Sequence, residues 1–333
     1  MKKLVITIPA YNEEKALGGL LDRIPQKVEG IKEITVLVID DGSIDETRKI
    51  AKRKGAQVIH HPHNLGLGVS FRKGIETALQ LGADVILNID GDGQFDPQDI
   101  PKLVTPVVKG EAECLTASRF LSPELKPKIS RTKYIGNKVM SFIISQITGK
   151  KYYDVSCGFR AYSREAALRM NLFGRFTYTQ ETFIDLAAKN IPILEVSVKV
   201  KGEREHGKSK VSSNLFKYGL LTLRIIVGAF RDYKPLKLMS FVSFLFILIG
   251  TPLGVFFLIH YIHTGAFKPH TWAGFLSFSS FILAVFMFIA GIFMETFSRM
   301  RMNQEQLLYL ARKDYYKTLK KVQGINKTSG EIE

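Results

Sequence analysis

Two long segments near the carboxyl end carry no charged residue, and they restrict the possible folds more than any other feature of the sequence. The first covers residues 238–259 and the second covers residues 271–294. Each is long enough for a helix to cross the roughly 30 Å hydrocarbon core of a bilayer. Core helices of soluble domains are usually shorter and carry some polar face. The sequence therefore predicts a hairpin of two transmembrane helices.

The residues that flank these segments predict the orientation of the hairpin. Arg231, Lys234 and Lys237 precede the first segment, and basic residues follow the second segment from Arg299 onward. The short connector between the segments holds a single basic residue, Lys268. The positive-inside rule then places both termini in the cytoplasm and the connector outside.

The part of the chain before the hairpin alternates strand-like and helix-like patterns. Near-continuous apolar runs occur at residues 4–8, 35–40, 57–60 and 85–90, with helical patterns between them. Such runs indicate parallel strands that helices cover on both faces of the sheet. We predict an α/β domain with a mostly parallel, Rossmann-like sheet, in which ligands bind beyond the carboxyl ends of the strands.

These patterns predict the following order of domains. The partly amphipathic end of the α/β domain can be an interfacial helix or a core helix. The polar tail is expected to begin as an interfacial helix and to end without a fixed structure. The predicted boundaries are 1–232 for a cytoplasmic α/β domain (211–232 as the interfacial helix), 236–262 and 271–296 for the transmembrane helices, and 297–333 for a cytoplasmic tail.

Charge and cysteine content narrow the classes of function. The formal net charge of +16 indicates an anionic partner, which could be nucleic acid, anionic lipid or a phosphorylated substrate. The basic residues gather at the membrane flanks and in a loop around residues 204–210, which argues against nucleic acid. Cys114 and Cys157 are too few for a disulfide framework and lack metal-ligand spacing, so we expect two reduced thiols.

The polar motif with the clearest chemistry follows the fourth predicted strand. It reads Asp90-Gly91-Asp92-Gly93-Gln94. Two carboxylates separated by glycine can converge on one hard cation, and Mg²⁺ or Mn²⁺ prefers such oxygen ligands together with substrate phosphates. A cation here would neutralise a leaving diphosphate. The alternative is an acidic turn without a ligand, since Asp and Gly dominate turns.

Two further motifs are expected at the same edge of the sheet. Residues 40–43, Asp-Asp-Gly-Ser, follow the second strand and could hydrogen-bond to a nucleobase or ribose, or simply form a turn with a helix cap. After the first strand, Tyr11 and Glu13 could stack on a base and bind a ribose. A histidine cluster at residues 60–63 could bind a metal, although no fourth ligand lies nearby in the sequence.

Together these motifs resemble those of a known enzyme family. The ordered set of Pro-Ala-Tyr-Asn-Glu-Glu, Asp-Asp-Gly-Ser and Asp-x-Asp with a glutamine two residues on is similar to family 2 inverting nucleotide-sugar glycosyltransferases, which have the GT-A fold. More narrowly, the chain resembles the dolichol-phosphate mannose synthase and polyprenyl-phosphate glycosyltransferase branch. Residues 117–120, 154–160, 179–181 and 204–210 add to the resemblance, which covers about residues 3–230. The predicted membrane hairpin also fits this branch.

The resemblance implies a reaction and its partners. One sugar would move, with inversion, from a UDP- or GDP-linked donor to a dolichyl or undecaprenyl phosphate at the cytoplasmic face of the cell membrane, with Mg²⁺ or Mn²⁺ as cofactor. A phosphate monoester is mostly dianionic at neutral pH and needs no strong base. The enzyme must instead bring two anionic substrates together and stabilise a departing diphosphate. No nucleic acid is expected, and homo-oligomerisation stays open.

The resemblance also assigns roles to individual residues. The predicted site residues are Pro9, Tyr11, Glu13, Asp41 and Asp90 for the donor nucleotide; Asp90, Asp92 and Gln94 for the metal; Arg119 and Arg131 for the acceptor phosphate; and Asp92, Arg204, Lys210, Glu181 and Asp154 for catalysis. Arg204 and Lys210 would belong to a mobile loop that closes over the donor phosphates. Glu181 and Asp154 could orient the sugar or a basic side chain.

Simpler alternatives exist for the basic residues. Arg119 could form a structural salt bridge, Arg131 could be a solvated helix start, and residues 204–210 could be a solvated charged loop.

Two other functions also stay open. A glycosyltransferase that acts on a lipid or glycan hydroxyl would need a general base, for which Glu181 and Asp154 are the candidates. A membrane-tethered sensor of nucleotide sugars would be expected to have a damaged Asp-x-Asp motif, whereas Asp90 and Asp92 are intact. The Gln-x-x-Arg-Trp signature of processive synthases is absent from the sequence, which favours the addition of a single sugar.

Overall fold

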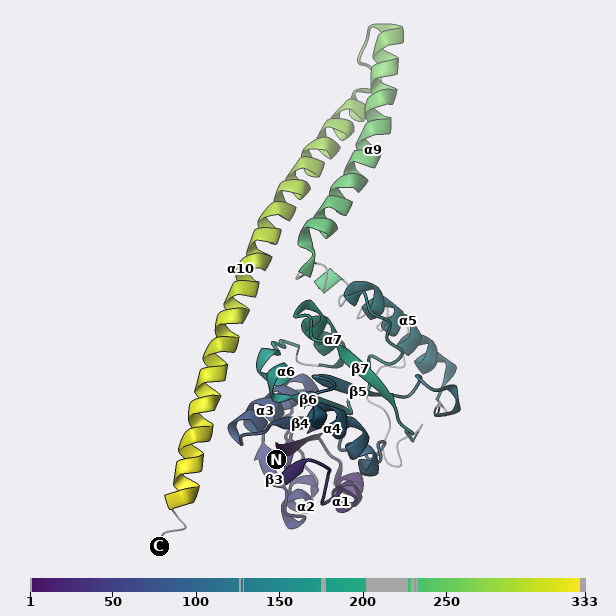
Figure 1. Cartoon of the computed structure of the whole chain (residues 1–333). Helices are drawn as coiled ribbons and strands as arrows, with labels where there is room; N and C mark the ends of the chain where they lie inside the picture. Colours follow the sequence, from purple (N-terminus) through teal and green to yellow (C-terminus); the bar gives the residue numbers. More distant parts are fainter. Residues whose placement is uncertain are drawn as a thin grey trace. The chain divides into compact units, whose positions relative to one another are not determined.

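The structure is a computed structural model of the chain, and it separates into two compact units (Figure 1). One unit combines residues 1–218 with residues 306–333, and the other comprises residues 219–305. The residues that the structure describes are 2–125, 127, 129–174, 178–201, 227, 228, 231 and 233–329. The predicted loop residues Arg204 and Lys210 lie outside them, as does nearly all of the predicted interfacial helix.

A seven-stranded sheet organises the first unit, in the order β3-β2-β1-β4-β6-β5-β7. The strands are β1 (Lys2–Ala10), β2 (Ile31–Asp40), β3 (Gln57–His60), β4 (Val85–Asn88), β5 (Cys114–Ser118), β6 (Arg160–Ser163) and β7 (Ile193–Ser197). Neighbouring strands are parallel except where β6 pairs antiparallel with β4 and β5. The predicted mostly parallel sheet is confirmed.

Helices cover both faces of this sheet. They are α1 (Glu14–Asp22), α2 (Thr47–Arg53), α3 (Leu67–Gln80), α4 (Ile100–Lys109), α5 (Arg131–Thr148), α6 (Arg164–Arg169) and α7 (Thr179–Ala188), with short 3-10 turns at Pro97–Asp99 and Pro123–Leu125. On β1, the buried Leu4, Ile6 and Ile8 share one core cluster with residues of α1 and α4. Thr7 points to the opposite face, where a Cβ on Gly74 of α3 would lie 3.3 Å from its Cβ. The continuous apolar run of β1 therefore reflects burial on both sides.

The second unit contains α9 (Pro235–Thr264) and the first part of α10 (Thr271–Ser329). Both helices are long and apolar enough to cross a membrane, by length and composition. Small residues line their contact: Ser277 Oγ donates to Gly250 O at 2.8 Å, and a Cβ on Gly254 would lie 2.7 Å from Ser277 Oγ. The spacing of four between the two glycines is the sequence signal for such close packing, because glycines let helix backbones approach.

The end of the tail was expected to have no fixed structure, and there the structure differs. Helix α10 continues to Ser329, and the part of it in the first unit packs on α6. Tyr309 and Tyr316 are each only 6% exposed, and the Tyr309 hydroxyl donates to Glu165 Oε1 at 2.6 Å. The two tyrosines are seven positions apart, which places them on one face of a helix. This apolar face gives the polar tail a surface that can pack.

Candidate active site

The Asp-x-Asp turn starts two residues after the end of β4. Asp92 is 7% exposed, and its Oδ1 accepts a hydrogen bond from the backbone N–H of Gln94 at 3.1 Å. Gly93 adopts a φ of 71°, in the left-handed region that glycine tolerates best. The turn therefore keeps Asp90, Asp92 and Gln94 within one short loop at the carboxyl edge of the sheet.

The Asp90 carboxylate lies against Gly158 and Tyr178. A Cβ built on Gly158 would lie 2.5 Å and 2.7 Å from the two Asp90 oxygens, and 2.8 Å from the Tyr178 hydroxyl. Any larger residue at 158 would displace this carboxylate. Burial raises the pKa of the Tyr178 phenol well above its usual range, and the negative charge of Asp90 adds to the rise, so this hydroxyl keeps its proton at neutral pH.

The donor set of the turn fits a hard divalent cation. Asp90, Asp92 and Gln94 carry oxygen donors, as Mg²⁺ and Mn²⁺ prefer. Over the described part of the chain, no group of three or more His, Cys, Asp or Glu side chains could hold a metal ion. A site with few protein ligands is typical of Mg²⁺ bound together with substrate phosphates rather than in an all-protein cage.

The loop after β1 is fastened to the loop after β2. The backbone N–H of Asn12 donates to Ser43 Oγ at 2.9 Å, and the N–H of Glu13 donates to Thr47 Oγ1 at 2.8 Å. The end of β1, just before this loop, contacts the acidic turn, because the N–H of Gly91 donates to Pro9 O at 3.3 Å. The structure thus brings Pro9 and Glu13, with Tyr11 between them, to the edge that holds Asp90. Their role in nucleotide binding stays a prediction.

The pair Asp40 and Asp41 is held by partners inside the protein. Asp40 Oδ2 lies 2.8 Å from His60 Nδ1, and Asp41 Oδ1 lies 2.9 Å from His61 Nδ1. Asp41 also accepts bonds from the backbone N–H groups of Leu65 and Gly66, at 3.0 Å and 2.9 Å. These pairs give His60 and His61 a structural role. Three partners on about four acceptor positions leave about one position of Asp41 for a nucleobase, so its role in nucleotide binding stays a prediction.

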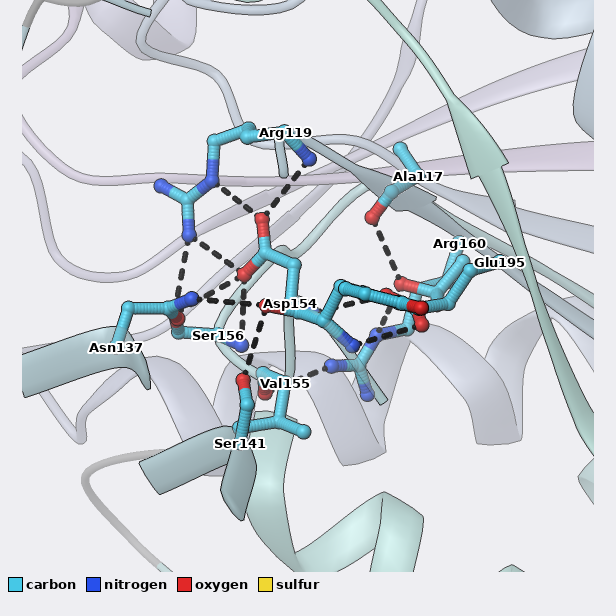
Figure 2. Close-up of polar contacts among 11 residues, drawn as sticks. Ala117, Arg119, Asn137, Ser141, Asp154, Val155, Ser156, Arg160 and Glu195 are labelled. Atoms are coloured by element: carbon cyan, nitrogen blue, oxygen red, sulfur yellow. Dashed lines mark hydrogen bonds and ion pairs between the residues drawn. The ribbon is translucent and has the colours of Figure 1, made fainter. Parts of the chain in front are cut away.

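Arg119 and Asp154 form a bidentate ion pair (Figure 2). The Nε and Nη2 atoms of Arg119 lie 2.6 Å and 2.8 Å from the two Asp154 oxygens, and its backbone N–H also donates to Asp154. Asp154 is fully buried, whereas 23% of the Arg119 side chain stays exposed. The structure therefore confirms the salt bridge that the sequence left open, and Asp154 orients a basic side chain.

This ion pair is linked to α5. Arg119 Nη2 donates to Ser156 Oγ at 3.0 Å, and Ser156 in turn bonds to Asn137 of α5 (Figure 2). Asn137 Nδ2 also donates to Tyr153 O at 3.2 Å. No sequence pattern assigned a role to Asn137, because an isolated Asn on a helix carries no signal of its own. Ser156 lies in the segment 154–160 that adds to the family resemblance, but it had no role of its own.

The two remaining predicted residues lie apart from this network. Glu181 accepts hydrogen bonds from the backbone N–H groups of Phe173 and Gly174, at 2.7 Å and 3.0 Å. Its carboxylate therefore fastens the loop before α7. Arg131 is exposed on the first turn of α5. Its role with an acceptor phosphate stays a prediction.

Comparisons with known proteins agree with this geometry. A model of the family "Glycosyl transferase family 2" matches residues 5–169. The UDP-N-acetylglucosamine–dolichyl-phosphate N-acetylglucosaminyltransferase of Methanococcus voltae is 30% identical over 218 residues, which cover 60% of this chain and 85% of that protein. The undecaprenyl-phosphate 4-deoxy-4-formamido-L-arabinose transferase of Proteus mirabilis is 28% identical over 307 residues, covering 88% of this chain and 86% of the relative.

A solved structure supports the fold. Glucosyl-3-phosphoglycerate synthase from Mycobacterium tuberculosis, in complex with Mn²⁺, UDP and phosphoglyceric acid, has a TM-score of 0.51 at 21% identity. The match covers 68% of this chain and 77% of that one, and it confirms the GT-A fold of the first unit. Since the Methanococcus relative is matched over 85% of its length, the chain belongs to glycosyl transferase family 2 and is a glycosyltransferase.

Proposed function

We propose that this glycosyltransferase moves one sugar, with inversion, from a nucleoside diphosphate sugar to a polyprenyl phosphate at the cytoplasmic face of the membrane. The observation that carries this proposal is that both candidate bases, Asp154 and Glu181, already have hydrogen-bond partners within the protein. Asp154 is fully buried in an ion pair with Arg119, and Glu181 accepts two backbone N–H groups. An acceptor hydroxyl needs a base within reach of its proton, whereas a phosphate acceptor does not.

The chemistry of a phosphate acceptor suits these surroundings. An oxygen of the acceptor phosphate forms a bond to the anomeric carbon of the sugar. The bond from that carbon to the donor diphosphate breaks, and its electron pair leaves with the diphosphate. No proton has to be removed, because the phosphate is already mostly dianionic near neutral pH.

Arg119 is the described residue best placed to attract the acceptor. Its Nε and Nη2 atoms hold Asp154, while 23% of the side chain remains exposed at the carboxyl end of β5. A guanidinium that is fixed by a buried carboxylate loses little further freedom when it binds an anion. Arg131, on the first turn of α5, is the second residue that we assign to the acceptor phosphate.

The donor side of the proposal uses the acidic turn and the first loop. Bound by Asp90, Asp92 and Gln94, Mg²⁺ or Mn²⁺ would neutralise charge on the leaving diphosphate. Tyr11 and Glu13 would bind the base and ribose. The names of the Methanococcus relative and of the Mycobacterium structure both include uridine diphosphate, so UDP-linked sugars are the first donors to test.

The membrane part of the proposal rests on α9 and α10. Both are apolar enough to span a bilayer, and the absence of charged residues from the core of each argues against a catalytic group there. The excess of basic residues outside the connector favours cytoplasmic termini. A catalytic domain on that side would meet nucleotide sugars in the cytoplasm and lipid phosphate in the inner leaflet.

A direct comparison of two acceptors tests the proposal. The full chain in detergent or nanodiscs would be offered polyprenyl phosphate or the matching polyprenol, each with a panel of UDP- and GDP-sugars. We expect a glycolipid product only from the phosphate. Transfer to polyprenol would support a hydroxyl acceptor instead. Nucleotide-sugar binding without any product would support a sensor.

A further inference from the structure

The side chain of Tyr178 is unusually well fixed for a residue that lies outside every predicted motif. It is 1% exposed, and its ring stacks on Phe71 of α3, with ring centroids 3.7 Å apart and planes within 3° of parallel. The guanidinium carbon of Arg160 lies 6.0 Å from the same ring centroid. A ring packed in this way has one orientation, so the position of its hydroxyl is set by the fold.

Two hydrogen bonds hold that hydroxyl. It accepts from Asn88 Nδ2 at 2.7 Å and donates to Gly158 O at 3.2 Å. Asn88 is the last residue of β4, and Thr7 Oγ1 of β1 donates to its Oδ1 at 3.2 Å. The strand that leads into the Asp-x-Asp turn is therefore bonded directly to Tyr178.

Asp90 and Tyr178 meet at Gly158. The two Asp90 oxygens and the Tyr178 hydroxyl lie 2.5, 2.7 and 2.8 Å from the point where a Cβ of residue 158 would be. The carboxylate thus lies over a bare Cα, with the phenol hydroxyl at its side. Glycine is required here for close approach, not for its backbone angles.

Arg160 keeps the parts of this arrangement together. It is fully buried, and it donates from Nη1 to Thr179 O at 2.9 Å and from Nη2 to Val155 O at 3.2 Å. The first bond fixes the start of α7, next to Tyr178. The second bond, from Arg160 to Val155, fixes the loop that leads to Gly158 (Figure 2). The two segments that lie beside Asp90, the start of α7 and the loop before Gly158, therefore both depend on the buried guanidinium of Arg160.

We propose that Tyr178 is a positioning residue, which with Gly158 holds the Asp90 carboxylate in the orientation that binds the divalent metal. The inference rests on the proposed function, because the metal role of Asp90 belongs to it. Groups that orient a metal-ligating side chain typically change metal affinity or activity about 10–100-fold when they are removed. Removing the Tyr178 hydroxyl should therefore act through the metal rather than on the nucleotide alone.

Metal binding by the full chain in detergent would test this. Mn²⁺ is titrated with and without UDP or GDP, and free Mn²⁺ is read from its EPR signal, for wild type, Tyr178→Phe and the control Tyr152→Phe. Tyr152 is a tyrosine of similar burial (5% exposed) that packs on Phe183 instead. We expect Tyr178→Phe to raise the Mn²⁺ Kd about 10-fold or more, and the control to leave it unchanged. Nucleotide binding in EDTA should be the same in all three.

The outcomes separate the two proposals. Equal Mn²⁺ affinity in folded wild type and Tyr178→Phe overturns the positioning role and leaves the proposed function intact. A wild type that binds no Mn²⁺ with either nucleotide contradicts the metal part of the proposed function and this inference with it. If Tyr178→Phe does not fold, Gly158→Ala decides, because its Cβ would displace the Asp90 carboxylate. Unchanged Mn²⁺ affinity in that variant also overturns the proposal.

Discussion

The two aspartate-rich turns at the edge of the sheet look alike in sequence, but the protein holds their carboxylates differently. Asp41 follows β2 and already has three partners within the protein: His61 and the backbone N–H groups of Leu65 and Gly66. Asp90 follows β4 and lies instead over a glycine, beside a buried phenol. The first turn builds the loop that begins α3, and the second presents carboxylates on one short loop.

The difference shows what decides the role of a carboxylate. Both turns end strands of one parallel sheet, so location alone does not distinguish them. A carboxylate that accepts several hydrogen bonds from within the protein, as Asp41 does, is held as a structural acceptor, since a buried donor without a partner costs about 1–3 kcal/mol. A carboxylate that packs against a glycine, as Asp90 packs against Gly158, can instead be oriented toward a ligand. Four tests follow from this contrast.

The largest effect is expected at the second turn. Asp92→Ala removes a carboxylate from the proposed metal site and should lower transfer about 10³-fold or more, because charge on the leaving diphosphate is no longer neutralised. Its thermal midpoint should stay close to that of the wild type. Initial rates with saturating Mn²⁺, next to a thermal unfolding scan, measure both. Wild-type rates in this variant, or in excess chelator, would remove the metal from the mechanism.

At the first turn, a backbone change should lower stability. Gly42 has a φ of 77°, and its Cβ would lie 2.5 Å from the backbone carbon of His63. We expect Gly42→Ala to lower the free energy of unfolding by about 2–4 kcal/mol, from left-handed strain and overpacking together. Urea unfolding would measure the loss.

Gly110→Ala is the matched control for this variant. Gly110 has nearly the same φ, 78°, but no atom lies within 4 Å of its Cβ position. Only the left-handed strain of about 1–2 kcal/mol applies there. Equal losses in the two variants would show that contact with His63 contributes nothing, which would weaken the structural reading of the first turn.

Asp41→Asn tests the same turn through its side chain. The amide keeps one acceptor oxygen but places an NH₂ group opposite backbone donors, so we expect a loss of about 1–3 kcal/mol in unfolding free energy. The donor KM should change little, because a side chain that holds the loop does not contact the nucleotide. A large rise in KM with unchanged stability would mean that Asp41 binds the nucleotide and that the contrast between the turns fails.

The smallest effect concerns the two thiols. Burial raises the pKa of Cys157, one residue before Gly158, to about 12, and that of Cys114 on β5 to about 12 as well. A raised pKa means that the neutral thiol persists as pH rises, so at pH 8 only about one thiol in 10⁴ is ionised. Iodoacetamide at pH 8 should leave both unmodified until the protein is denatured. Rapid alkylation of Cys157 alone would mean that the region around Asp90 opens.

Much of the fold could be predicted because its signals are local. Near-continuous apolar runs between helical patterns indicated the parallel sheet, and two uncharged segments indicated the apolar helices. The three motifs at strand ends were expected at one edge, and the contact between Gly91 and Pro9 confirms that two of them meet there. Family resemblance added the expected identity of the ligands, which no periodicity can give.

The tertiary structure decided which side chains are partners. Asp154 meets Arg119 across 35 positions of sequence, and Tyr178 meets Asn88 across 90. The docked tail is a similar case, because Tyr309 lies 144 positions from its acceptor Glu165. Sequence patterns report how a segment buries its own apolar face, since that depends on neighbouring residues. Which donor binds a given carboxylate depends on tertiary contacts between residues far apart in the sequence, which no local pattern records. Those contacts distinguish the aspartates that are held by partners within the protein from the ones that we assign to its metal.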